Sequence, residues 1–229
     1  MRTKKKIQIF IDFAMTIMMP VLMAYSLVGE LLHEWLGIAM YVLFIAHKFI
    51  NAKWYKSLFK GKYSAKRITN TVIDGLLFVD MIALMVSGII LSRHVFVALQ
   101  LQRGLSFART AHLLSVYWGF VLISVHAGFH VNSLIRAIGK AVGITKPSYK
   151  RKFIFRTLVI AISAYGIYAF IKRQLGMYML LQIQFVFFDH SEPLVFFLMD
   201  YLAIMALFTY VGHIISGLLS NNYLKMEFK

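Results

Sequence analysis

Cysteine is absent from the 229 residues of this chain, and acidic residues are scarce, with nine aspartates and glutamates against 25 lysines and arginines. Without cysteine the protein forms no disulfide, no iron–sulfur cluster and no thiolate bond to haem iron. Histidine, which occurs eight times, must therefore bind any soft metal.

Charge of either sign is also scarce. Charged residues make up 15% of the chain, whereas soluble domains carry about 25%. Hydrophobic residues make up 60%, and the mean hydropathy is +0.71. A soluble domain could not cover so apolar a chain with polar groups, so we expect a membrane protein in contact with the lipid bilayer.

Long apolar runs divide the chain into candidate membrane spans. A helix needs roughly 17 to 25 apolar residues to cross the hydrocarbon core. The sequence predicts six spans within a single membrane domain of residues 1–229, at residues 7–29, 32–50, 70–92, 109–130, 155–172 and 194–219. These runs are too long for the short alternating strands of a barrel. The predicted fold class is therefore all-α, a polytopic membrane helix bundle of about six transmembrane helices.

The basic residues predict the orientation of this bundle. All but five of the 25 lie in the N-terminus, in the loops 48–67 and 131–156, or in the C-terminus. Segments rich in lysine and arginine remain in the cytoplasm, so both termini are predicted to be cytoplasmic. These loops also explain the net charge of +16, and we expect no nucleic acid as a partner.

Two of the predicted spans carry histidines at the same spacing. His33 and His47 are fourteen residues apart in the second span, and His112 and His126 are fourteen apart in the fourth. Fourteen residues are nearly four helical turns, so the two rings of each span lie about 40° and about 21 Å apart. Each span is therefore expected to place one histidine near each edge of the membrane.

The second and fourth spans run in the same direction, because one crossing separates them. His33 can then face His112 near the outer surface, and His47 can face His126 near the cytoplasmic surface. We call these the outer pair and the inner pair. Each pair suits one low-spin haem, because two axial imidazoles leave the iron no open position and favour electron transfer.

Histidines inside a membrane also have another interpretation. They can bond neighbouring helices or line a pore, since any intramembrane ionisable group is costly and usually has a role. The alternative function is thus a histidine-lined transporter for protons or metal ions. Zinc is disfavoured, because it needs a tetrahedral cluster and these pairs are too far apart to form one. Asp80 and Asp200, also in predicted spans, are expected to be neutral or paired.

Two further residues are candidates for binding the haems. His130 lies one turn after His126 on the same helix face, and it is a possible alternative inner ligand. Arg109 lies one turn before His112, where its guanidinium is well placed to bind a propionate of the outer haem.

Five segments carry a resemblance to a known family. They are GELLHEWLG at 29–37, HKFINAKWYK at 47–56, KGKYS at 60–64, SGIILSR at 87–93, and RTAHLLSVYWGFVLISVHAGFH at 109–130. With them the chain resembles the bacterial flavinylation-associated cytochromes over most of residues 5–130. More distantly, the paired fourteen-residue spacing is similar to that of cytochrome b and ferric-reductase transmembrane domains.

The resemblance implies more than the spacing does. It implies two haem b groups in a multi-pass protein of the bacterial cell membrane. It also implies electron flow from a cytoplasmic reductant or a quinol to an extracytoplasmic flavin-carrying acceptor. No GxGxxG unit is present, so the donor and the acceptor are expected to be separate molecules, and the chain is expected to have no catalytic residues of its own.

Overall fold

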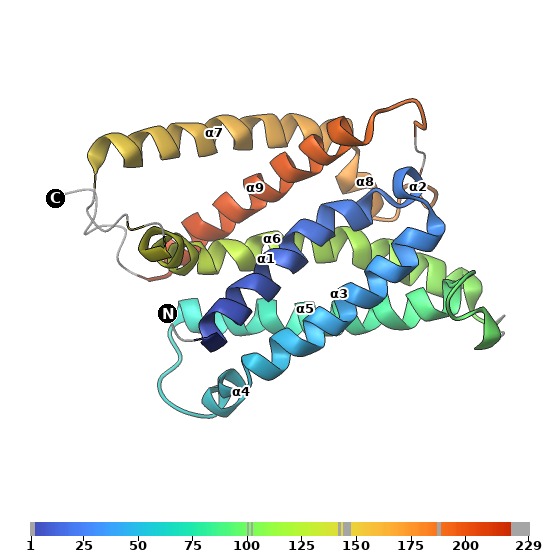
Figure 1. Ribbon diagram of the computed structural model, residues 1–229, viewed down its shortest axis with the longest axis horizontal. Helices are drawn as coiled ribbons and strands as arrows, with labels where there is room; N and C mark the ends of the chain where they lie inside the picture. The colour runs from blue at the N-terminus through green and yellow to red at the C-terminus, as the bar shows by residue number, and fades with distance from the viewer. Residues whose placement is uncertain are drawn as a thin grey trace. The chain divides into compact units, whose positions relative to one another are not determined.

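The structure is a computed structural model that describes residues 3–99, 101, 103–141, 143, 148–186 and 189–220. Within these residues the chain forms helices and no strand (Figure 1). In chain order the helices are α1 (Thr3–Met23), α2 (Tyr25–Val28), α3 (Glu30–Ile50), α4 (Lys53–Leu58), α5 (Ala65–Leu91), the 3-10 turn η1 (Val97–Leu99), α6 (Leu105–Ala141), α7 (Tyr149–Lys172), α8 (Leu175–Met179) and α9 (Leu194–Leu218). The predicted all-α class is confirmed.

Five of these helices, α1, α5, α6, α7 and α9, are long and apolar enough to cross a membrane. Large hydrophobic side chains lie exposed along them, among them Phe10, Val79, Phe155, Ile171 and Val195. So much exposed apolar surface is unfavourable in water and suits the hydrocarbon of a bilayer. The chain thus has the architecture of a multi-pass membrane protein.

The second predicted span, residues 32–50, forms the helix α3. This helix has 21 residues, as many as α1. It is not among the five helices that are long and apolar enough to cross a membrane, and two glutamates, two histidines and a lysine lie along it. The count of six spans therefore stays a prediction.

The apolar runs mark the middle of a helix better than its ends. The sequence predicts a span at 109–130, whereas α6 has 37 residues and is about 55 Å long. α5 and α7 also begin before their predicted spans. The reason is that a helix satisfies its own backbone groups and continues where its side chains become polar.

The first predicted span, residues 7–29, is interrupted before its end. α1 ends at Met23, α2 is a single short turn, and Gly29 has a φ angle of 88°. Glycine adopts this conformation without the steric cost of a side chain. The Gly29 carbonyl accepts a hydrogen bond from the His33 N–H at 3.0 Å, so the turn at Gly29 sets where α3 begins and where His33 lies on it.

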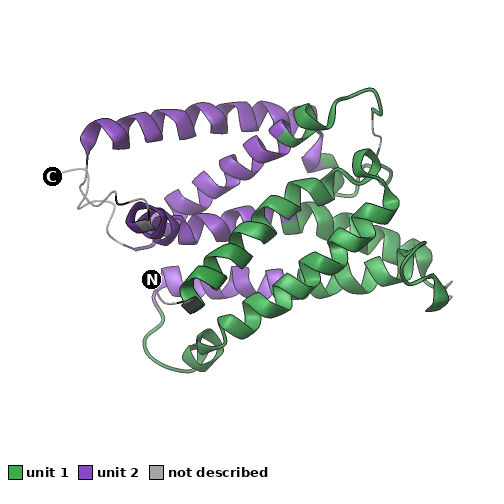
Figure 2. Cartoon of the chain, viewed as in Figure 1, with its two compact units in different colours: residues 1–63, 78–119, 177–198 green, residues 64–77, 120–176, 199–229 purple. Residues whose placement is uncertain are grey.

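The chain divides into two compact units (Figure 2). Unit 1 comprises residues 1–63, 78–119 and 177–198, and unit 2 comprises residues 64–77, 120–176 and 199–229. Helices α5, α6, α8 and α9 contribute residues to both. Of the four predicted ligands, His33, His47 and His112 belong to unit 1, and His126 belongs to unit 2.

In unit 2, α6 and α9 approach each other through glycines. A Cβ atom added to Gly128 would lie 2.2 Å from the Thr209 carbonyl oxygen, and one added to Gly212 would lie 2.3 Å from that of Val125. The Thr209 hydroxyl donates to the Ser124 carbonyl at 3.1 Å across the same contact. These two helices therefore pack backbone against backbone, as small residues allow in membranes.

Gly128→Ala is expected to destabilise the protein by about 1–3 kcal/mol, because the added methyl group would overlap the α9 backbone and force the helices apart. Thermal unfolding in detergent, followed by circular dichroism, measures this change. Gly75→Ala is the matched control, since nothing lies within 4 Å of a Cβ atom at that position. Equal melting temperatures for Gly128→Ala and the wild type would contradict the close packing.

Candidate functional site

The outer pair of histidines comes together in unit 1. His33 lies on α3 and His112 lies on α6, with their ring centres 6.4 Å apart and their planes at 69°. Two imidazoles that bind one metal ion from opposite sides, each through a bond of about 2 Å, have ring centres about 6 Å apart. The separation of these two rings therefore fits a pair of axial ligands on one metal centre.

Ser87 on α5 orients the ring of His112. The Ser87 hydroxyl donates to the Ala83 carbonyl at 2.6 Å, so its oxygen accepts a hydrogen bond from the His112 Nδ1–H, at 3.0 Å. This contact places the proton on Nδ1 and leaves the lone pair of Nε2 available. Metal-bound histidines have such a partner on the other ring nitrogen almost always.

His33 lies in more apolar surroundings. Its Nδ1 is buried without an aligned hydrogen bond, although the Leu22 carbonyl of α1 interacts with the ring. The Tyr25 ring packs edge-on against it, with the ring centres 5.1 Å apart. A buried polar group without a full set of partners costs free energy, and coordination of a metal would stabilise this imidazole.

His47, also in unit 1, is paired with a carboxylate of α1. Its Nδ1–H donates to Oδ1 of Asp12 at 2.7 Å. The amide nitrogen of Asn51, one turn later, makes a long contact of 3.4 Å with Nε2. Gln8 of α1 donates to the Asn51 side-chain oxygen at 2.7 Å. Polar groups of α1 therefore hold this end of α3 and orient the His47 ring.

His126 has a similar carboxylate neighbour in unit 2. Its Nδ1 lies 2.8 Å from Oδ1 of Asp74 on α5, close enough for an ion pair though not aligned as a hydrogen bond. Asn70 donates to the other Asp74 oxygen at 3.0 Å. The His130 ring centre is 4.8 Å from that of His126. Because His47 and His126 belong to different units, their pairing stays a prediction.

Arg109 lies one turn before His112 on α6, as the sequence predicts, and its side chain is exposed. It lines a small cavity of about 80 Å³ together with Ser106, Thr110 and Gln184. The cavity is in unit 1 and partly polar. Its place beside the helix turn that holds His112 is compatible with the predicted propionate contact, which stays a prediction.

A larger groove of about 380 Å³ lies along α3 and α5 in unit 1. Its lining is mostly aromatic and aliphatic, and it includes Phe44, Lys48 and Phe78. The Lys48 amino group lies 5.2 Å and 5.6 Å from the ring centres of Phe44 and Phe78, so one cation faces two aromatic rings. An apolar groove with a single cation suits a flat, weakly polar ligand.

No family model, curated protein or solved structure matches the chain. The resemblance to flavinylation-associated cytochromes therefore stays a prediction, and the site is interpreted through its own geometry. Among the described residues, no group of three or more histidines and carboxylates is placed to hold a metal ion. A bis-histidine haem needs only two protein ligands, so its requirement differs from that of a zinc centre.

Three partners of the histidines were not predicted from the sequence. Two of them, Asp12 and Asp74, lie inside apolar runs, IFIDFAM and TVIDGLL. A carboxylate in such a run is costly, so each of them could have been flagged as needing a partner. Ser87 carries no comparable signal, because serine is common in membrane helices and bonds to its own backbone.

The two carboxylates that the sequence analysis singled out differ in their partners. Asp200 on α9, 1% exposed, accepts hydrogen bonds from Tyr165, Lys172 and Arg173 at 2.5, 2.9 and 2.8 Å, so it is paired as expected. Asp80 on α5 fills the space above Gly119, where a Cβ atom would lie 2.2 Å from its Oδ2. That oxygen is buried and makes no hydrogen bond.

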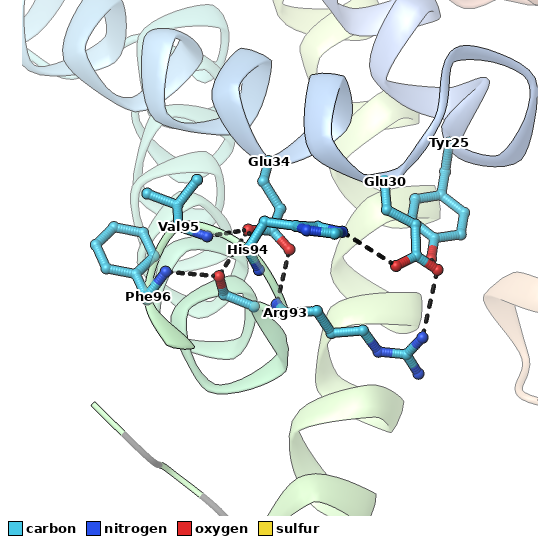
Figure 3. A network of polar contacts seen from close by, with 8 residues as sticks. Tyr25, Glu30, Glu34, Arg93, His94, Val95 and Phe96 are labelled. Carbon is cyan, nitrogen blue, oxygen red and sulfur yellow. Dashed lines mark hydrogen bonds and ion pairs between the residues drawn. The ribbon is translucent and has the colours of Figure 1, made fainter. Parts of the chain in front are cut away.

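Glu34, the neighbour of His33, fastens the segment that follows α5 to α3 (Figure 3). Its carboxylate accepts a hydrogen bond from the Ser92 hydroxyl at 2.7 Å. It also accepts from the backbone N–H groups of residues 93–95, at 2.8, 3.2 and 2.9 Å. Four donors on one carboxylate hold α3 and the end of α5 in a defined register beside the outer pair.

Glu30, one turn before Glu34, extends the same network (Figure 3). It contacts Arg93 at 3.3 Å and His94 at 3.5 Å. The Tyr25 hydroxyl donates to it at 2.7 Å. His94 is therefore engaged with a carboxylate of α3.

Glu34→Ala is expected to loosen the segment after α5. Hydrogen bonds to a charged group contribute about 1.5–3 kcal/mol each, so amide exchange of residues 93–95 should accelerate at least about tenfold. Hydrogen–deuterium exchange of a peptide spanning residues 92–96 measures this. Glu192→Ala is a control for the loss of a surface carboxylate, and unchanged exchange in Glu34→Ala would disprove the role of the network.

Proposed function

We propose that the chain is a dihaem b-type membrane cytochrome that carries electrons across the bilayer. His33 and His112 are the axial ligands of the outer haem, and His47 and His126 are those of the inner haem. The protein is an electron-transfer component of an oxidoreductase system. Its donor and acceptor are separate molecules.

One observation carries this proposal, namely the 6.4 Å separation of the His33 and His112 rings on two different helices. Each histidine has a partner on another helix, the Leu22 carbonyl for His33 and the Ser87 hydroxyl for His112, and yet the two rings also approach each other. Two imidazole rings inclined at 69° to each other are poor partners in an apolar region, unless a metal ion joins them. The Nδ1 contact of His112 with Ser87 supports the same interpretation.

The residues of the chain have a limited set of tasks in this function. Haem, when bound, supplies the one-electron chemistry. His33 and His112 would hold the haem iron, and two histidine ligands suit electron transfer rather than oxygen binding. Ser87 keeps the proton of His112 on Nδ1 and thereby directs Nε2 toward the metal.

The inner haem is supported by the surroundings of its two predicted ligands. His47 and His126 each have a carboxylate at Nδ1, the arrangement that orients metal-bound histidines in proteins. His126 is preferred to His130 as the ligand, because its side chain is 27% exposed whereas His130 is exposed. We assign Arg109 to a propionate of the outer haem.

We also propose that α3 is a sixth membrane span, in a bacterial cell membrane with both termini in the cytoplasm. Its 21 residues span about 31 Å, the thickness of the hydrocarbon core. A histidine that binds haem no longer has the free-energy cost of an unpaired polar side chain in the membrane. A haem-bound α3 is therefore more compatible with the membrane than its sequence alone suggests. The basic loops support the orientation.

The donor in this proposal is a quinol or a cytoplasmic reductant, and the acceptor is an extracytoplasmic protein that carries flavin. The aromatic groove lined by Phe44, Lys48 and Phe78 supports a quinol, since it flanks His47 along α3 and is mostly apolar. The flavin-carrying acceptor follows from the family resemblance. Reduction of an impermeant flavin outside proteoliposomes that enclose a reductant tests this direction.

Purified protein from haem-replete cells is expected to be coloured and to contain about two haem b per chain. A dithionite-reduced minus oxidised spectrum and pyridine haemochrome analysis measure the content. A colourless preparation that binds metal ions would disprove the cytochrome and favour the histidine-lined transporter.

Histidine variants are expected to remove the haems one at a time. His33→Ala and His112→Ala should each lower the haem content by half, because each removes one axial ligand of the same iron. His47→Ala and His126→Ala should remove the other half, and His190→Ala, whose ring contacts Ser26 at 3.3 Å, should retain both. Loss of the same spectral component in His33→Ala and His47→Ala would contradict the assignment.

A further inference from the structure

The histidines of the inner pair have negatively charged partners. Asp12 Oδ1 lies 2.7 Å from the Nδ1 of His47, within unit 1. Asp74 Oδ1 lies 2.8 Å from the Nδ1 of His126, within unit 2. Each contact is complete within its own unit. Both inner ligands therefore have a carboxylate on the ring nitrogen that points away from a metal bound at Nε2.

The histidines of the outer pair have neutral partners. His112 donates to the Ser87 hydroxyl at 3.0 Å, and His33 interacts with the Leu22 carbonyl. The carboxylate nearest in sequence is Glu34, but its oxygens accept four hydrogen bonds from residues 92–95. Its charge is thus shared among these donors and is not held at an imidazole nitrogen.

We propose that Asp12 and Asp74 lower the reduction potential of the inner haem below that of the outer haem, and so direct electrons outward. This inference rests on the proposed function, since it needs two bis-histidine haems. A negative charge at Nδ1, hydrogen-bonded in Asp12 and in unaligned ion-pair contact in Asp74, increases the electron density of the imidazole and so stabilises the oxidised iron. A hydroxyl or a backbone carbonyl has this effect more weakly, because it carries no full charge.

Cations near the inner pair would raise the reduction potential of the inner haem, so their effect must be compared with that of the carboxylates. Lys4, Lys5 and Lys6 at the start of α1 are exposed, and exposed charges are screened by salt beyond about 8 Å. Lys48 directs its amino group over the Phe44 ring. The carboxylates contact the ligand rings directly at less than 3 Å, and although the Asp12 side chain is 44% exposed and so partly screened, Asp74 is only 11% exposed. We therefore expect the effect of the carboxylates to be the larger one.

The consequence is a preferred direction of electron transfer between the two haems. One electron passes from the site of lower potential to the site of higher potential, with no bond formed or broken and no proton transferred. The reductant that refills the inner site is the quinol or cytoplasmic donor of the proposed function. The external flavin acceptor then oxidises the outer site. Transfer in this direction is downhill between the two haems and needs no added energy.

Redox titration of the full-length protein in lipid nanodiscs, followed by visible absorbance, tests the proposal. The wild type is expected to show two midpoint potentials. Asp12→Asn and Asp74→Asn remove one charge each at almost constant size. Each should raise the lower potential by about 59 mV or more, a tenfold change in the ratio of reduced to oxidised haem, and leave the higher potential unchanged.

Two control variants separate charge at the ligand from other effects. Asp12→Glu keeps the carboxylate and should keep the lower potential close to that of the wild type. Asp189→Asn removes an exposed carboxylate that bonds only its neighbour Ser191 among the described residues, and it should change neither potential. Equal shifts in Asp189→Asn and Asp12→Asn would overturn the proposal, because a general charge effect would then explain both.

His33→Ala provides a second measurement that does not depend on the carboxylate variants. It should retain only the inner haem, and the remaining component should be the one of lower potential. A remaining component of higher potential would overturn the inference even if the asparagine variants lost their haem. If the wild type contains no haem, the proposed function fails instead, and the two failures are thus distinguished.

Discussion

A polar side chain in an apolar helix bundle needs a partner, because no water is present to replace one, and the candidate site depends on this constraint. Three of the four predicted ligands meet it through Nδ1, since His112 bonds Ser87 and the two inner histidines contact carboxylates. A ring held at Nδ1 has a defined orientation, and its Nε2 can bind a metal. At His47 the Nε2 makes only a long contact of 3.4 Å with the Asn51 amide nitrogen. The contacts that lower the free-energy cost of these histidines in the bundle therefore also orient their rings to bind a metal.

Helix α5 connects the outer pair within unit 1. Ser87 on α5 bonds His112 of α6, and Glu34 of α3 bonds the segment that follows α5. Both ligand helices are thus tied to one element, and the distance between the His33 and His112 rings follows from these two attachments. In unit 2 the helices are held together differently, by the direct backbone contact of α6 with α9 at Gly128. Hydrogen bonds orient side chains, whereas small residues set the distance between helices.

Hydropathy predicted the helical class and five of the spans, because the need to bury or expose apolar surface acts on whole segments. It was less accurate at the ends. The run 7–29 contains the break at Met23 and the turn at Gly29, which depend on backbone conformation rather than on hydropathy. For α3 the difficulty is a different one. Its polar residues lower its hydropathy, although the helix is as long as α1.

The sequence by itself determined that His33 and His47 share one helix and that His112 and His126 share another, because a fourteen-residue spacing is a local property of helices. It also led to the expectation that His33 faces His112, from the direction of the spans. Only the tertiary structure decided how close these two rings lie, and which of Ser87, Asp12 and Asp74 contacts which ring. Such contacts join residues far apart in the chain, and their geometry depends on helix rotation and depth, which local spacing does not encode.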